Sequence, residues 1–211
     1  MSLRQKVIPP DYFGAKYFSS GSYKTYKQDA HKWIGPMAKR MVTFLRRQGV
    51  GQLRVLDVGC TYGWLLAELQ QVHGCTVTGL EYSPWVIARA DRSVRRLIKQ
   101  GNVLNANVFP PRHFDAVICF EVVEYLTPEQ TRQAIAHLVR WCRGFIFFST
   151  VYQHSRWASQ VKNPNPGRIT ALSQKEYRRL FELAGASLVR TVNWGNYGTL
   201  MIFAIKKSRQ K

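Results

Sequence analysis

The sequence predicts an α/β fold built on a doubly wound, mostly parallel seven-stranded sheet with an antiparallel C-terminal hairpin. The apolar run that starts at Leu53 ends in a turn with two glycines, and a helix-patterned segment, residues 64–72, follows. Strand-like and helix-like segments then alternate as far as residue 185, which is typical of a parallel sheet covered by helices. Finally, residues 188–193 and 200–206 are strand-like and joined by a short connection that contains glycine, which predicts a hairpin.

Capping signals mark where several helices start. Thr127-Pro-Glu-Gln130 and Ser173-Gln-Lys-Glu176 have the pattern of a capping box, and Ser83 followed by proline predicts another helix start. The second capping box begins a helix that should end near Gly185. The remaining strands are expected at residues 76–80, 96–102, 114–120 and 144–149. A helix is expected over residues 31–47, and its buried face should consist of Ile34, Met37, Ala38, Met41, Phe44 and Leu45. The buried face of the helix after Thr127 should consist of Ile135, Leu138, Val139 and Cys142.

Length and charge bound the organisation of the chain. With 211 residues it has the size of one domain, so we expect residues 1–52, an aromatic arm and a helix, to belong to the same domain as residues 53–211. The formal net charge is +19, and residues 1–52 and 150–211 together hold +17 of it. This distribution favours an anionic substrate or partner, but a solvated basic surface explains it equally well.

The cysteine pattern supports neither a zinc site nor a disulfide framework. The four cysteines, Cys60, Cys75, Cys119 and Cys142, are scattered and form no C-x-x-C pair, so we expect no metal. No apolar segment has the length of a membrane span, and the first residues lack the apolar core of a secretory signal. We therefore expect a cytoplasmic protein that does not associate with a membrane.

The turn after the first strand is the strongest functional signal. A strand that stops at Asp57 and Gly59, followed by a helix start, leaves backbone N–H groups open for a nucleotide-like ligand. Gly59 and Gly63 lie four residues apart, whereas a dinucleotide site requires the pattern G-x-G-x-x-G. The spacing therefore disfavours an NAD oxidoreductase.

Val55-Leu-Asp-Val-Gly-Cys-Thr-Tyr-Gly63 resembles the first motif of the class I S-adenosylmethionine-dependent methyltransferases, in the group that acts on small molecules. Thr61 stands where that motif has its middle glycine, and we expect it to fit with a negative φ. The resemblance implies a Rossmann-like fold, S-adenosyl-L-methionine as cofactor and S-adenosyl-L-homocysteine as product. The cofactor-binding residues that it implies are Asp57, Gly59, Cys60, Thr61, Gly63, Glu81, Tyr82, Asn102, Val103 and Glu121.

Two of these residues have a specific expected role. Glu81 ends the second strand, 22 positions beyond Gly59, and the resembling enzymes place an acidic residue there to accept both hydroxyl protons of the ribose. Asn102 stands where they place an aspartate for the adenine amino group, and its amide oxygen can accept the same hydrogen bond without a charge. Asn105 is the alternative if the third strand shifts its register.

Glu121-Val-Val-Glu-Tyr-Leu126 resembles the family segment Glu-Val-Leu-Glu-His-Leu, with Tyr125 in place of the histidine. If the methyl acceptor is a hydroxyl or an amine, a base must take its proton, and Glu124, Tyr125 and His154 are the candidates. The long polar loop over residues 150–172 is assigned to substrate. The expected substrate contacts are Tyr17, Tyr23, Tyr152 and Arg156.

The arm over residues 9–33 combines aromatic rings, glycines and lysines. Such a segment can close over a bound ligand as a lid, can simply pack on the following helix, or can bind single-stranded nucleic acid. The lid interpretation expects hinges at Gly14 and Gly21.

Together these patterns predict a methyltransferase that acts on a small, anionic or carbohydrate-like metabolite. The motifs of adenine-amino and cytosine-C5 methyltransferases, Asn/Asp-Pro-Pro-Tyr/Phe after the fourth strand and a Pro-Cys pair, are absent. An RNA methyltransferase remains an alternative because of the charge, and so does a cofactor-binding interaction protein without turnover. The sequence identifies neither the acceptor atom nor the oligomeric state.

Overall fold

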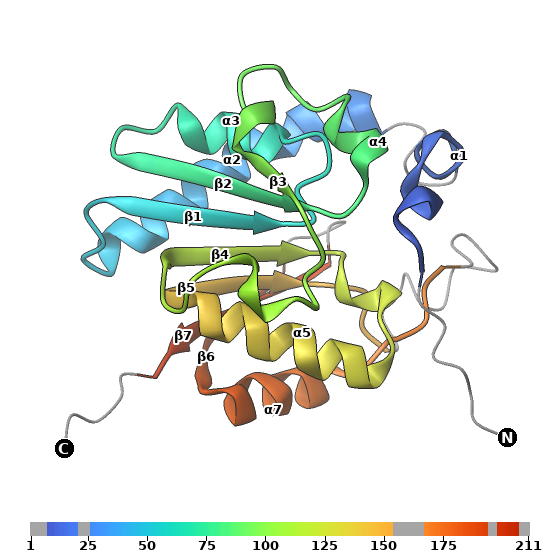
Figure 1. Ribbon diagram of the computed structural model, residues 1–211. Helices are drawn as coiled ribbons and strands as arrows, with labels where there is room; N and C mark the ends of the chain where they lie inside the picture. Colours follow the sequence, from blue (N-terminus) through green and yellow to red (C-terminus); the bar gives the residue numbers. More distant parts are fainter. Residues whose placement is uncertain (1–7, 21–25, 154–166, 194–197, 207–211) are drawn as a thin grey trace, which may run out of the picture. The chain divides into compact units, whose positions relative to one another are not determined.

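The structure, a computed structural model, describes residues 8–20, 26–153, 167–193 and 198–206 (Figure 1). Its strands form a seven-stranded sheet in the order β3-β2-β1-β4-β5-β7-β6. The pairs β2–β3, β1–β2 and β4–β5 are parallel, and β7 is antiparallel to both β5 and β6. The predicted fold class is therefore confirmed, including the antiparallel C-terminal hairpin. The chain divides into two compact units, Pro9–Val103 and Leu104–Lys211 with Met1–Ile8, which we describe separately.

The unit Pro9–Val103 contains three parallel strands. In the parallel pair of β1 and β2, Asp57 lies opposite Gly79. The third strand is shorter than predicted, because residues 95–97 form a 3₁₀ turn before it. The elements are η1 (Pro10–Phe13), α1 (Ala15–Phe18), α2 (Tyr26–Arg47), β1 (Leu53–Val58), α3 (Trp64–Gln70), β2 (Cys75–Glu81), α4 (Pro84–Ile87), η3 (Arg95–Leu97) and β3 (Ile98–Gln100).

Helix α2 starts five residues earlier than predicted and contains Pro36. Its apolar stripe is buried, as expected from the three- and four-residue spacing. Phe44 is only half-buried, and Val42, which the prediction left out, is buried. The guanidinium of Arg46 donates to the carbonyl oxygen of His73 (2.9 Å), so the C-terminal end of α2 is fixed to the turn before β2.

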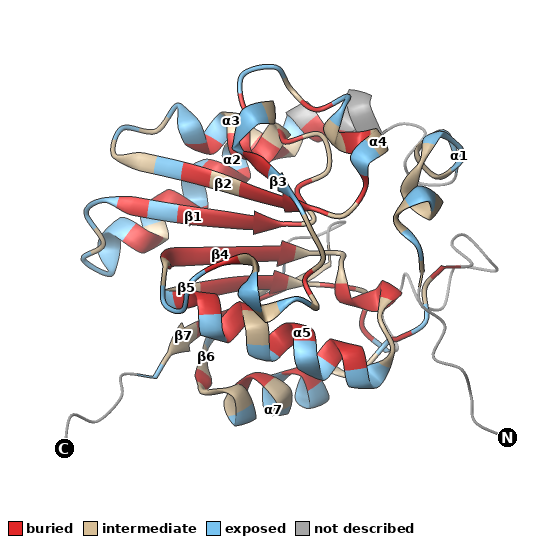
Figure 2. Cartoon of the chain, in the orientation of Figure 1, coloured by how far each residue is buried: buried red, intermediate tan, exposed pale blue. Residues whose placement is uncertain are grey.

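The unit Leu104–Lys211 contains the other four strands, and Figure 2 shows that β4 is buried along most of its length. In β5 the buried residues are Cys142, Ile146, Phe147 and Phe148. The core between strands and helices is aromatic: the rings of Phe181 on α7 and Phe203 on β7 stack with centroids 4.0 Å apart. Its elements are η4 (Ala106–Val108), β4 (Phe114–Phe120), η5 (Val123–Tyr125), α5 (Pro128–Trp141), β5 (Cys142–Ser149), α7 (Gln174–Ala184), β6 (Ala186–Asn193) and β7 (Thr199–Ile205).

Both predicted capping boxes are present. The Thr127 hydroxyl accepts from the Gln130 N–H, and the Gln130 side chain accepts from the Thr127 N–H, so α5 starts where predicted. Ser173 and Glu176 form the same arrangement at α7, which ends at Gly185 in the left-handed conformation. One assignment was wrong: Cys142 lies at the start of β5, because α5 ends at Trp141.

Candidate functional site

The turn after β1, residues 59–63, has an unusual backbone. Gly59 and Gly63 have φ of 74° and 75°, in the left-handed region that glycine adopts without a Cβ clash. Thr61 also has a positive φ, 48°, so the expectation of a negative value was wrong. The Thr61 N–H donates to Oε2 of Glu81 (2.9 Å), and this charge-assisted hydrogen bond offsets part of the strain.

Glu81 lies at the end of β2 and orients that turn. Oε2 accepts from Thr61, while Oε1 accepts from the Ser83 N–H (2.8 Å), and the residue is 7% exposed. Burial raises the pKa of Glu81, and the backbone N–H groups of Ser83, Thr61 and Tyr82 counteract that effect. Each carboxylate oxygen can accept a further hydrogen bond, which suits a pair of ribose hydroxyls.

Asp57 and Cys60 lie buried beside this carboxylate. Burial and then the negative charge of Glu81 raise the pKa of Asp57 to about 8. Burial also raises the pKa of the Cys60 thiol, so that side chain packs as a small apolar group. Its sulfur fills the space over Gly79, where an added Cβ would lie 2.6 Å from Sγ.

The residues after β2 and β3 extend the site. The Gly101 N–H donates to the carbonyl oxygen of Glu81 (2.9 Å), which joins the ends of the two strands. Tyr82 and Asn102 are half-buried, and Val103 is 7% exposed. Their predicted contacts with the cofactor remain predictions.

The arm packs beside the turn within the same unit. The Ser83 hydroxyl, which also caps α4, donates to the carbonyl oxygen of Phe13 (2.7 Å). The Phe18 ring contacts Tyr62 edge-on (5.3 Å between centroids) and stacks on Trp85. These contacts place the arm against Tyr62 in the turn after β1 and against Ser83 and Trp85, which follow Glu81.

Within the unit Leu104–Lys211, two carboxylates follow β4 and share one guanidinium. Arg168 Nη2 lies 3.6 Å from Oε2 of Glu121, and its Nε lies 3.7 Å from Oε1 of Glu124. The side chain of Glu124 is fully buried, and its Oε2 accepts from the Thr150 hydroxyl (2.8 Å). Glu121 has a strained backbone, with φ of 53°.

The other predicted acceptor-site residues have different environments. Tyr125 is buried next to Glu124, and its hydroxyl interacts with Arg168. Tyr152 is buried and donates to the carbonyl oxygen of Thr199 (3.1 Å), and burial raises its pKa. Tyr17 on α1 is half-buried against Phe13 and Phe18. Tyr23, His154 and Arg156 lie outside the described residues.

The sequence showed no sign of the contact between Ser83 and Phe13. It placed Arg168 only within the loop assigned to substrate, without its pairing with Glu121 and Glu124. The carbonyl of Phe13 is a backbone group, which carries no sequence signal. Arg168 is fixed by the N–H groups of Ile169 and Thr170, which both donate to the carbonyl oxygen of Glu124 (2.6 and 3.1 Å). Glu124 and Ile169 lie far apart in the sequence, and no repeating pattern of residues predicts a hydrogen bond between them.

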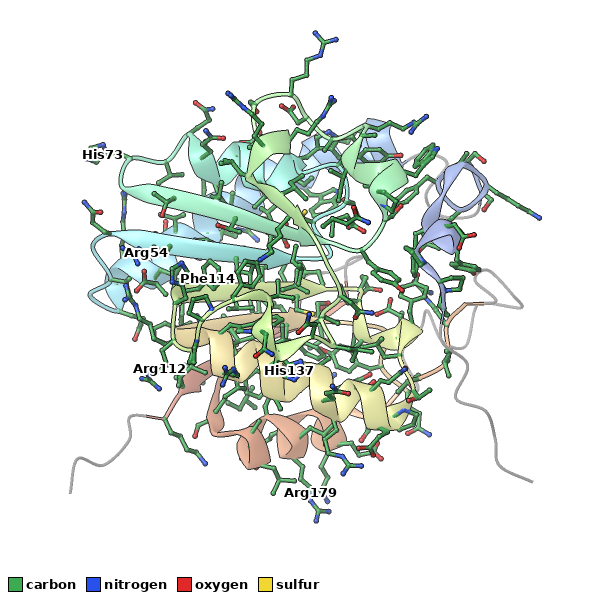
Figure 3. All side chains as sticks on the ribbon, in the orientation of Figure 1. Arg54, His73, Arg112, Phe114, His137 and Arg179 are labelled. Carbon is green, nitrogen blue, oxygen red and sulfur yellow. The ribbon has the colours of Figure 1, made fainter. Side chains whose placement is uncertain are left out.

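Other titratable groups give no competing site in the part of the chain that is described. His73 lies in the turn before β2, at the opposite end of that strand from Glu81, and His137 lies on α5 (Figure 3). Across residues 8–20, 26–153, 167–193 and 198–206, no group of three or more His, Cys, Asp or Glu side chains is placed to hold a metal ion. No helix in these ranges has both the length and the apolar character to cross a membrane.

A mostly parallel sheet of this strand order, with a glycine turn after β1 and a buried carboxylate at the end of β2, defines the class I S-adenosylmethionine-dependent methyltransferases. The chain belongs to the methyltransferase domain family, whose model matches residues 27–191. The chemistry of the site fits the cofactor, because each oxygen of the oriented, buried carboxylate of Glu81 can accept a further hydrogen bond. The contacts expected of Glu81 with the ribose and of Asn102 with the adenine amine remain predictions.

Among curated proteins, the chain is 36% identical over 123 residues to the ubiquinone biosynthesis O-methyltransferases of Yersinia pestis and Yersinia pseudotuberculosis. The alignment covers 55% of this chain and 50% of each relative. The chain therefore matches about half the length of these relatives.

Among solved structures, the fold is similar to the magnesium protoporphyrin IX methyltransferase of Synechocystis PCC 6803 with bound S-adenosylhomocysteine (18% identity, TM-score 0.68, 94% of this chain and 98% of that chain). It is also similar to the protein PH0226 of Pyrococcus horikoshii OT3 (16% identity, TM-score 0.72, 91% and 99% coverage). A third is CalS10, an amino pentose methyltransferase of Micromonospora echinaspora with bound S-adenosylmethionine (18% identity, TM-score 0.68, 87% and 96% coverage).

Proposed function

We propose that this protein transfers the methyl group of S-adenosylmethionine to a hydroxyl group of a small molecule. The observation that carries the proposal is the carboxylate of Glu81, which the N–H groups of Thr61 and Ser83 orient at the end of β2. The curated relatives, which are named as O-methyltransferases, support oxygen as the acceptor atom.

When bound, the cofactor supplies a methyl group on a positively charged sulfur, which makes a good leaving group. The protein has to hold the ligand, align the acceptor and keep water away. Glu81 and Asn102 are suited to the first task, since a carboxylate and an amide oxygen accept from the ribose and the adenine amine. The aromatic arm, through Phe13 and Phe18, is suited to the last.

The contacts of Arg168 favour an uncharged acceptor group over the anionic one expected from the composition. Its positive charge lies between Glu121 and Glu124, so it is already compensated. A carboxylate or phosphate placed there would meet two carboxyl groups. An anionic group elsewhere on the substrate is compatible with this arrangement.

The test is methyl transfer from radiolabelled S-adenosylmethionine to catechol, 3,4-dihydroxybenzoate, methyl glucoside, aniline and unfractionated RNA. We expect label on at least one hydroxyl compound. Label on aniline alone would contradict oxygen as the acceptor, and label on RNA alone would favour the RNA methyltransferase. Micromolar binding of S-adenosylhomocysteine without any transfer would favour an interaction protein.

A further inference from the structure

We propose that Glu121 accepts the proton of the acceptor hydroxyl and that Arg168 positions it for this task. The inference deepens the proposed function and rests on it. Glu121 directly follows β4, and ligands of open α/β sheets bind at the carboxyl ends of the parallel strands.

Glu121 is the accessible member of the pair of carboxylates. Its side chain is 37% exposed, whereas that of Glu124 is fully buried and bonded to Thr150. A proton acceptor must reach its substrate, so Glu121 can act where Glu124 is enclosed. Glu124 can instead tune its neighbour, because burial and then Glu124 raise the pKa of Glu121.

The backbone holds Glu121 in one orientation. Its N–H donates to the carbonyl oxygen of Ser149 (3.0 Å), which fixes the residue to the end of β5 despite its positive φ. Strain of this kind persists only where the surrounding structure enforces it.

The cluster retains unused hydrogen-bonding capacity. Both ion pairs of Arg168 are longer than a hydrogen bond, and among the described residues neither Nε of Arg168 nor the buried Oε1 of Glu124 has a hydrogen-bond partner. Buried polar atoms are normally paired, so these two indicate a water or a polar ligand group in this cluster. The hydroxyl group of a methyl acceptor could accept a hydrogen bond from Nε of Arg168 and donate one to Oε1 of Glu124.

The surroundings of Glu121 strengthen it as a base. Burial and the neighbouring Glu124 raise its pKa, and Arg168 lowers it. Tyr152 and Tyr177 also interact with Glu121, and the pKa of each phenol is raised by burial, so both stay neutral.

The hydroxyl proton passes to the Glu121 carboxylate while the acceptor oxygen forms a bond to the methyl carbon. The bond from that carbon to sulfur breaks, and its electron pair stays on sulfur, which becomes neutral. The proton then leaves Glu121 to solvent.

The experiment compares the wild type with Glu121→Gln and, as a matched control, Glu129→Gln on the exposed face of α5. The acceptor is the hydroxyl compound of the panel above that the wild type methylates fastest. In Glu121→Gln we expect kcat to fall about 100-fold or more and the acid limb of the pH profile to disappear. The family resemblance also implies Glu121 as a cofactor-binding residue, and calorimetry with S-adenosylhomocysteine distinguishes the two roles. A base should leave this affinity within about twofold, because it contributes little to binding the product, whereas a large loss of affinity would make Glu121 a cofactor contact and overturn the inference. Glu129→Gln should match the wild type.

Arg168→Met and Arg168→Lys provide the second measurement. Loss of the positive charge should raise the pKa of Glu121, so Arg168→Met should move the acid limb to higher pH, and Arg168→Lys should restore it in part. Infrared spectroscopy of the ligand-free protein should show a protonated carboxyl band that titrates with this limb and is missing in Glu121→Gln.

An unchanged pH profile or near-normal kcat in Glu121→Gln would overturn the inference while leaving the proposed function intact. If Glu121→Gln fails to fold, an unchanged acid limb in Arg168→Met would overturn it equally. Failure of the proposed function shows earlier, because the wild type would then methylate no hydroxyl compound, and the inference would fall with it.

Discussion

The ring of Phe18 stacks on the indole of Trp85, with centroids 5.9 Å apart and planes 11° from parallel. The guanidinium of Arg89 lies 4.0 Å from the centroid of the same indole. Trp85 follows Glu81 by four residues, so this stack joins the aromatic arm to the segment that carries the carboxylate proposed to bind the ribose. The contact agrees with the lid hypothesis, and it also fits simple packing.

Phe18→Ala separates these two interpretations. If the arm closes over the cofactor, the substitution should weaken S-adenosylhomocysteine binding about tenfold, which corresponds to roughly 1.4 kcal/mol. The half-buried ring should contribute little to global stability, so the unfolding midpoint should move only slightly. Calorimetry and thermal unfolding measure the two effects. An unchanged affinity together with a lowered midpoint would favour packing.

Glu81→Gln should weaken S-adenosylhomocysteine binding by about 1–3 kcal/mol, because the charge-assisted hydrogen bonds to the ribose would be lost. The amide preserves the shape, but its NH₂ group would oppose the N–H of Thr61 or Ser83. Titration calorimetry on the folded variant measures the change. Equal affinity in the variant and the wild type would remove Glu81 from the cofactor site.

Asp57 should make stability fall as pH rises. Its pKa is raised in the folded state from 3.8 to about 8, so the folded protein holds a proton that the unfolded chain has lost between these values. The contribution of this carboxyl to stability is fully present below about pH 4 and is lost as the pH approaches about 8.

Asp57→Asn cannot titrate, so it should remove this dependence and be more stable than the wild type near pH 8, by an amount on the order of a few kcal/mol. Denaturant unfolding at several pH values measures the difference. Parallel stability curves for the variant and the wild type would show that Asp57 titrates normally.

Gly79→Ala should destabilise the protein by about 1–3 kcal/mol. The added Cβ would lie 2.6 Å from Sγ of Cys60 and 2.8 Å from Cδ1 of Leu66, both in the packed core. Gly51→Ala is the control, because an added Cβ there meets nothing within 4 Å. Denaturant unfolding of both variants tests the packing beneath the cofactor turn, and equal stability would contradict it.

Any RNA binding should be electrostatic, since the excess positive charge lies in residues 1–52 and 150–211 without a base-reading motif. The affinity for a single-stranded RNA should fall at least about 100-fold between 50 and 200 mM salt. Fluorescence anisotropy at both concentrations measures this. Binding that resists salt and depends on base sequence would instead promote the RNA methyltransferase alternative.

The sequence by itself determined the features that depend on near neighbours in the chain. The capping box at Thr127 and the run of apolar residues in β4 act through contacts within a few residues, so their patterns predicted the helix start and the strand bounds. The sequence also located the glycine turn and Glu81, because Gly59 directly follows β1 and Glu81 is the last residue of β2.

Only the tertiary structure decided how residues far apart in the chain share their charges and hydrogen bonds. Thr61 adopts a positive φ with its N–H on the carboxylate of Glu81, 20 positions away. Glu124 is buried rather than exposed because Thr150 and Arg168, on other segments, supply its partners. The energy of such pairs depends on burial and distance, and neither quantity is encoded in local sequence.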